Sequence, residues 1–142
     1  MGTLSKIGFA FNKKMFTSCE DGYYVCCESD FPQDERDVIS IDINSMQSEK
    51  LTVFVGGKLG ESLELEGSIA MKDYAISKLK EIFGSSISKS LGKCLTTSWL
   101  SNNLSKGSYS FSKPTEIDQR KELAKDLNDT KKLINELIQG KK

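Results

Sequence analysis

The sequence predicts an α+β domain in which a mixed or antiparallel β-sheet has helices covering one face. Three observations support this class. Segments with strand patterns come mainly in the first half of the chain, and the clearest helical pattern follows them at residues 68–83. Residues 38–43 alternate apolar and polar side chains, as expected of a strand with one buried face. A run of strands followed by helices is typical of α+β folds, because a parallel α/β sheet would alternate the two.

The remaining early strands are predicted from apolar patterning and turn residues. Residues 6–11 alternate, with their larger apolar side chains on one face. Residues 15–19 and 23–27 flank Glu20-Asp21-Gly22, and an Asp-Gly step between two such runs predicts a β-hairpin. Residues 51–55 are almost entirely apolar and β-branched, which predicts a central strand buried on both faces.

Two helices are expected after the Gly56-Gly57 pair. Residues 58–65 can form a short helix, and residues 68–83 place their apolar side chains on one face at helical spacing. Ser68 is the predicted N-cap of the second helix, and Gly84 is the predicted glycine that ends it.

The last third of the chain is predicted to hold a strand, a loop and a helical tail. Residues 93–99 form the strand, which ends at the single tryptophan, Trp99. Residues 101–112 are rich in Ser, Asn and Gly, which is typical of a loop. Beyond Pro114 the apolar residues recur at the spacing of an amphipathic helix. These residues are Leu123, Leu127, Ile134, Leu137 and Ile138.

Composition excludes several classes of function. The 142 residues suit one domain, and 20 basic residues balance 20 acidic ones, so no attraction to nucleic acid or to anionic membranes is expected. Histidine is absent, which excludes Ser-His-Asp catalysis and histidine-ligated zinc. The 4 cysteines have no C-x-x-C spacing and are expected to be reduced thiols without a metal. No segment has the apolar length of a transmembrane helix or a signal peptide, which favours a cytoplasmic protein.

Two further patterns leave alternatives open. The glycine-rich residues 56–60 follow a strand, so they can form a phosphate cradle or a tight strand-to-helix turn; the spacing matches no P-loop and favours the turn. Glu61, Glu64 and Glu66 lie near one helix, but their spacing selects no pair of carboxylates for acid–base chemistry. No catalytic residue is therefore assigned.

The segment from Thr96 to Phe111 is the most informative one for function. It places Trp99 at a predicted strand end and Tyr109 further along, within Gly-Ser-Tyr-Ser. A tryptophan at a strand end commonly packs against the core. A Gly/Ser-rich loop can also bring flat aromatic rings up to a ligand, so both interpretations stay open.

This segment resembles the C-terminal part of the flavin-containing amine oxidases, a family that includes polyamine oxidases, monoamine oxidases and lysine-specific histone demethylases. The interval from Trp99 to Tyr109 is similar to that of the polyamine oxidase and demethylase branch. Residues 7–14, 51–61 and 71–84 resemble family segments in the same order. Residues 114–127 are similar to the family segment after Gly-Ser-Tyr-Ser, so the resemblance covers most of the chain.

The resemblance implies an activity and a set of roles. Family members oxidise the C–N bond of an amine by passing a hydride equivalent to the flavin ring of FAD. Tyr109 would line the substrate cavity, and Trp99 would pack beside the flavin and shape the same wall. Aromatic faces would also attract the cationic form of the amine. The implied domains are a substrate-domain segment at residues 1–127 and a helical tail at residues 128–142.

Several family features have no counterpart in this sequence. The dinucleotide fingerprint of the FAD-binding Rossmann half, the lysine that reaches the flavin through a water, and the Gly-Glu motif that touches FAD are missing, and Asn102-Asn103 replaces the family's Asp-Pro. We therefore expect a truncated, split or degenerate relative. It would not bind FAD tightly alone, and would oxidise a small amine only with a partner chain carrying the Rossmann half. Two alternatives stay open: a non-catalytic binding module with the same fold, and an unrelated α+β interaction domain.

Overall fold

The computed structural model describes residues 2–27 and 38–109, together with the C-terminal residues 125, 130–132, 134–136 and 138. Contacts within the chain separate it into two units, Met1–Tyr109 and Ser110–Lys142. In the second unit the described residues are helical. The predicted boundary at residue 127 falls outside the described residues and stays a prediction.

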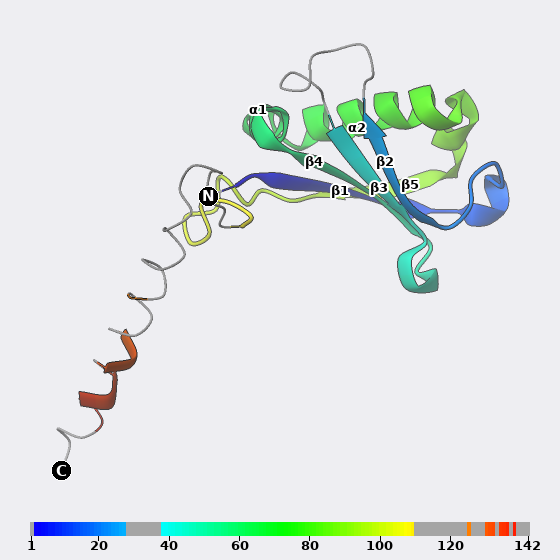
Figure 1. The fold of residues 1–142 in the computed structure, drawn as a ribbon. Coiled ribbons are helices and arrows are strands. Elements are labelled where there is room, and N and C mark those ends of the chain that lie inside the picture. Colours follow the sequence, from blue (N-terminus) through cyan, green and yellow to red (C-terminus); the bar gives the residue numbers. More distant parts are fainter. Residues whose placement is uncertain are drawn as a thin grey trace. The chain divides into compact units, whose positions relative to one another are not determined.

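One antiparallel sheet of five strands, in the order β2-β3-β4-β1-β5, forms the first unit (Figure 1). The strands are β1 (Leu4–Phe11), β2 (Gly22–Cys27), β3 (Val38–Ile43), β4 (Lys50–Gly56) and β5 (Leu91–Thr96). β1 and β4 are far apart in sequence but pair along most of their length, with Ile7 opposite Val53. The α+β class is therefore confirmed, and the sheet is antiparallel rather than mixed.

Two α-helices, α1 (Gly57–Glu66) and α2 (Ser68–Phe83), cover one face of the sheet (Figure 1). Gly84 ends α2 at a φ of 86°, as predicted. The predicted N-cap role of Ser68 is wrong, because Ser68 is the first residue of α2 and Gly67 occupies the cap without a side-chain hydrogen bond. Gly67 has a φ of 102°, which glycine adopts readily, so the turn between the helices depends on backbone freedom rather than on a capping side chain.

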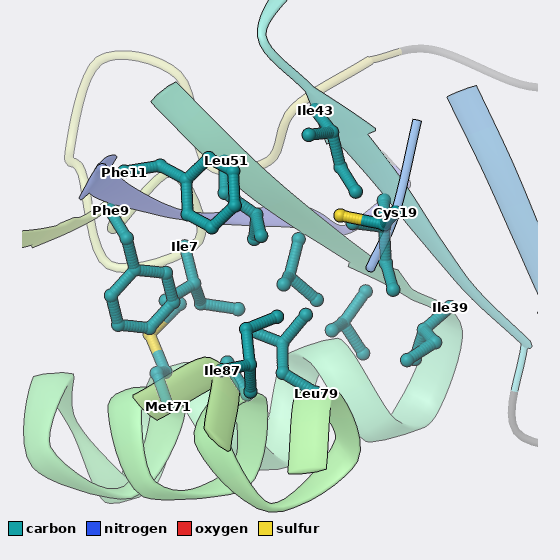
Figure 2. Packing of buried hydrophobic residues seen from close by; sticks show 14 of the residues in the cluster. Ile7, Phe9, Phe11, Cys19, Ile39, Ile43, Leu51, Met71, Leu79 and Ile87 are labelled. Carbon is teal, nitrogen blue, oxygen red and sulfur yellow. The ribbon is translucent and has the colours of Figure 1, made fainter. Parts of the chain in front are cut away.

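The hydrophobic core lies between the helices and the sheet face that they cover (Figure 2). Every second residue of β3 and β4 is buried there, so the predicted alternation at residues 38–43 is confirmed. Met71 and Leu79 extend from α2 toward the sheet, and Met71 lies beside Phe9 of β1. Burial of a side chain of this size contributes about 1.5–3 kcal/mol, so this face holds the sheet and helices together.

The other sheet face, called here the open sheet face, is the one that neither α1 nor α2 covers (Figure 1). Thr52 and Phe54 of β4 point to it and are only partly buried. The prediction that residues 51–55 are buried on both faces is therefore wrong, because both helices lie on the same side of a central strand. Phe54 is instead shielded by Tyr23, with ring centroids 6.3 Å apart, and by the Lys6 ammonium, 5.6 Å from its centroid.

The hairpin predicted around Glu20-Asp21-Gly22 is also wrong. After β1 the chain forms a short 3-10 helix at Lys13–Met15, and β2 pairs with β3 instead of with residues 15–19. Phe16 is 3% exposed and contacts Phe11 edge to face, with centroids 6.3 Å apart. Long-range packing of this segment into the core outweighs the local turn preference of Asp-Gly.

Candidate functional site

The candidate site is the loop from Thr97 to Tyr109, called here the aromatic loop, which follows β5. The predicted strand at residues 93–99 is shifted, because β5 ends at Thr96 and leaves Trp99 inside the loop. The amide of Gly107 donates to the carbonyl of Trp99 at 3.0 Å, and the hydroxyl of Ser105 donates to the same carbonyl at 2.8 Å. These bonds close the loop, so the backbone of Trp99 lies close to the Gly-Ser-Tyr segment.

The Tyr109 end of the aromatic loop pairs with the residues before β1. Gly2 donates its amide to the carbonyl of Tyr109 at 2.6 Å, and Ser108 donates its amide to the carbonyl of Gly2 at 2.8 Å. The Ser108 hydroxyl lies 3.0 Å from both the amide and the carbonyl of Leu4. A Cβ on Gly2 would lie 2.6 Å from Cζ of Tyr109, so only glycine lets this ring lie against the backbone.

The Thr97 end of the aromatic loop is held by β1. The amide of Thr97 donates to the carbonyl of Lys6 at 3.0 Å, and the amide of Lys6 donates to the Thr97 hydroxyl at 2.9 Å. Both ends of the loop are therefore anchored to the N-terminal part of β1 and the residues just before it.

Glu64 of α1 provides a third anchor, and it was not recognised from the sequence. Its side chain is only 9% exposed, and its two carboxylate oxygens accept hydrogen bonds from the Ser5 hydroxyl at 2.8 Å and from the Leu100 amide at 2.9 Å. Through these two hydrogen bonds the Glu64 side chain joins α1, β1 and the loop. The sequence contained only a weak indication of this role, namely that Gly60 and Glu64 lie four residues apart and therefore share one face of α1.

The structure brings both predicted site residues onto this one anchored loop and leaves both partly exposed. Trp99 is 41% exposed and Tyr109 is 47% exposed. Neither residue is buried in the core, which was one of the two interpretations open for Trp99. An aromatic side chain with an exposed surface can contact a ligand, and a cation in particular is attracted to its ring face.

Groups with displaced pKa values lie near the opposite end of β1. The Lys13 ammonium is 3.0 Å from a carboxylate oxygen of Asp21, and this contact raises the pKa of Lys13 and lowers the pKa of Asp21. Burial raises the pKa of the Cys19 and Cys94 thiols, which disfavours the reactive thiolate. In the described ranges no three His, Cys, Asp or Glu side chains gather in a way that could hold a metal ion.

The chain passes directly from β4 into α1 between Gly56 and Gly57, so the strand-to-helix turn is tight, as predicted, and residues 57–60 form the first turn of α1. A Cβ on Gly60 would lie 2.6 Å from the carbonyl oxygen of Val55, so this glycine allows close packing of the helix on the strand. The amide of Gly57 donates to the carbonyl of Thr3 at 3.3 Å. These contacts within the chain favour the turn over a phosphate cradle.

Comparison of the chain with protein-family models, with curated proteins and with solved structures finds no match. Within the described part of the chain, none of the helices combines the length and the apolar character needed to cross a bilayer.

Proposed function

We propose that this chain is the substrate-domain part of a flavin amine oxidase-like protein, which oxidises a small amine when a partner chain supplies the FAD-binding Rossmann domain. The observation that carries the proposal is the aromatic loop, which presents Trp99 and Tyr109 with partly exposed side chains on a backbone anchored at three places. This loop is the segment on which the resemblance to the family is centred. At the level of fold class, the α+β architecture agrees with the mixed or antiparallel sheet with helices on one face that we expected.

In this proposal the chain binds and orients the amine. A protonated amine is attracted to the faces of Trp99 and Tyr109, and such contacts contribute about 0.5–2 kcal/mol each depending on desolvation. The anchoring of the loop reduces the ordering cost of binding, because Gly2, Ser108 and Glu64 already restrict its backbone. Trp99 would also be the side chain that lies against the flavin.

The residues that the structure describes do not fit FAD without a partner. A dinucleotide cradle needs glycine-rich backbone amides at a helix N-terminus, open to the pyrophosphate. The turn at Gly57 and Gly60 is the nearest candidate, and it is occupied by the contacts with Thr3 and Val55 described above. The proposal therefore assigns the cofactor to the partner chain.

Reconstitution tests the enzymatic part of the proposal. The chain is co-expressed with a candidate partner that carries G-x-G-x-x-G, and we expect a yellow complex that releases hydrogen peroxide when spermine is added. Tyr109→Ala should lower the rate at limiting spermine, whereas Tyr23→Ala on the open sheet face should not. A complex that binds FAD but leaves spermine and benzylamine unoxidised would contradict the proposal.

A non-catalytic binding module is the second candidate, and it is favoured by the self-contained core of residues 2–109. The helices and one sheet face bury their apolar side chains against each other without a further chain. This candidate shares the amine site with the first but predicts no flavin-containing complex. Spermine binding by the isolated chain without any yellow complex would select it.

A further inference from the structure

A second candidate site lies at the far end of β1, where β1 and β5 lose their register. The pairing shifts between Phe9 and Phe11, so that Ala10 faces two residues of β5, Gly92 and Lys93. Such a β-bulge interrupts the hydrogen-bond ladder and is frequent next to binding sites. Gly92 is close to Ala10, since a Cβ at Gly92 would lie 3.3 Å from the Cβ of Ala10. A larger side chain at position 92 would therefore fill space beside the bulge.

Two cavities of about 400 and 390 Å³ open at this bulge, and both have Ala10 and Glu49 in their walls. We call the two together the bulge pocket. Each volume falls within the range of pockets that hold small ligands, about 300–1,000 Å³. The carbonyl of Glu49 accepts a hydrogen bond from the amide of Phe11 at 2.8 Å, which fixes the β3–β4 turn against β1 at this point.

The charged residues in the walls of the bulge pocket are mostly positive. Lys14, Lys50 and Lys93 contribute three ammonium groups, and Glu49 contributes one carboxylate. All four side chains are exposed, so the lysines can reach an anion at the pocket mouth while keeping their charge in solvent. An amine cation would be repelled here, which separates this pocket from the aromatic loop.

The remaining walls favour a ligand with an apolar part. Leu95 is 69% exposed on the open sheet face and lines the pocket together with Ala10. Ser90 lines the other of the two cavities, the one of about 400 Å³, and its buried hydroxyl has no hydrogen-bond partner among the described residues. A buried hydroxyl without a partner is unfavourable, and a hydroxyl is a suitable donor to a carboxylate oxygen.

We propose that the bulge pocket binds a small aliphatic carboxylate. The carboxylate pairs with Lys93 and the neighbouring lysines, and the short hydrocarbon chain covers Ala10 and Leu95. This site is independent of the proposed amine oxidase function, because its residues lie at the opposite end of β1 from Tyr109.

Titration with sodium butyrate, followed through the backbone amide NMR signals of the folded chain, tests the proposal. We expect saturable shifts at Gly92, Lys93 and Glu49, and no saturable shifts there with n-butylammonium, which has the same hydrocarbon chain. Lys93→Gln should weaken butyrate binding about two- to fivefold, the effect expected for one exposed ion pair. The matched control, Lys58→Gln on α1, should leave the affinity unchanged.

A second variant separates the pocket from a general attraction between charges. Gly92→Val places a side chain in the pocket without changing its charge, and it should abolish the saturable shifts while the remaining spectrum stays that of a folded protein. If Gly92→Val unfolds the chain, the butyrate affinities of Lys93→Gln and Lys58→Gln still test the proposal, because only Lys93→Gln should bind butyrate more weakly. Absence of saturable shifts with butyrate, an equal response to n-butylammonium, or tighter binding of inorganic phosphate than of butyrate would overturn the proposal.

Discussion

The amide of Leu100 donates a hydrogen bond of 2.9 Å to the carboxylate of Glu64, and through it helix α1 holds the aromatic loop. The second carboxylate oxygen accepts the Ser5 hydroxyl, so the same side chain also holds β1. A buried carboxylate is stable only when its oxygens have such partners, and here each oxygen has one. The position of Trp99, next to Leu100 in the chain, therefore depends on a helix that is distant in sequence.

Replacing Glu64 should loosen the aromatic loop. Glu64→Ala removes both bonds and leaves the Leu100 amide and the Ser5 hydroxyl without this acceptor, so a loss of about 1–3 kcal/mol in the free energy of unfolding is expected. The fluorescence of Trp99, the single tryptophan, should shift to longer wavelength as its surroundings become wetter. Glu61→Ala, an exposed change on the same helix, is the control, and an equal effect of both variants would show that Glu64 does not anchor the loop.

Gly2→Ala should displace the Tyr109 ring. The added Cβ would lie 2.6 Å from that ring, which is too close for any real contact, so either the ring or the backbone at Gly2 must move. Overpacking of this kind typically costs about 1–3 kcal/mol. Thermal unfolding and the Tyr109 ring signals in NMR measure the effect. Gly8→Ala is the matched control, because the nearest atom to a Cβ added at Gly8 is the Leu95 carbonyl oxygen at 3.9 Å. Unchanged Tyr109 signals in Gly2→Ala would contradict the pairing of Gly2 with Tyr109.

Truncating a leucine should lower the free energy of unfolding strongly in the core and only slightly at the surface. Leu79 is fully buried against the sheet, so Leu79→Ala should lower the free energy of unfolding by about 2–5 kcal/mol. Leu65→Ala removes the same atoms at a position that is 73% exposed, and its effect should stay within about 0.5 kcal/mol. Denaturant titration of both variants measures this difference. Similar losses in both would indicate that α2 does not pack as described.

Stability should fall in acid partly through Asp21. Its hydrogen bonds to Lys13 and Asn44 lower the pKa of the carboxyl below 3.8 in the folded protein, so the ionised form stabilises the fold above about that pH. This contribution is lost as the pH falls through the lowered pKa. Asp21→Asn should therefore reduce the drop in melting temperature between pH 5 and about pH 2. An unchanged acid profile in Asp21→Asn would contradict the ion pair.

Sequence patterns correctly predicted the strands and helix ends that are determined by residues close together in the chain. The alternation at Ile39, Ile41 and Ile43 marks one buried strand face, and Gly84 ends α2 because the chain needs a positive φ there. By contrast, the burial of Phe16 depends on contacts with Phe11 and with the distant Phe83, so a local turn preference led to the wrong hairpin.

The candidate site shows the same division. Trp99 and Tyr109 were found because aromatic residues stand out in a Ser- and Gly-rich segment. Glu64 was missed because no feature of the neighbouring sequence distinguishes it from Glu61. Its partners lie 59 and 36 positions away in the chain, and only the fold brings them to one carboxylate.

Calorimetric titration of the chain with spermine tests the central claim most directly, because it asks whether the aromatic loop binds an amine without any cofactor or partner. We predict measurable heat for the unmodified chain, binding about two- to thirtyfold weaker for Tyr109→Ala, and unchanged binding for Tyr23→Ala. Absence of heat with the unmodified chain, or equal affinity in Tyr109→Ala, would contradict the account.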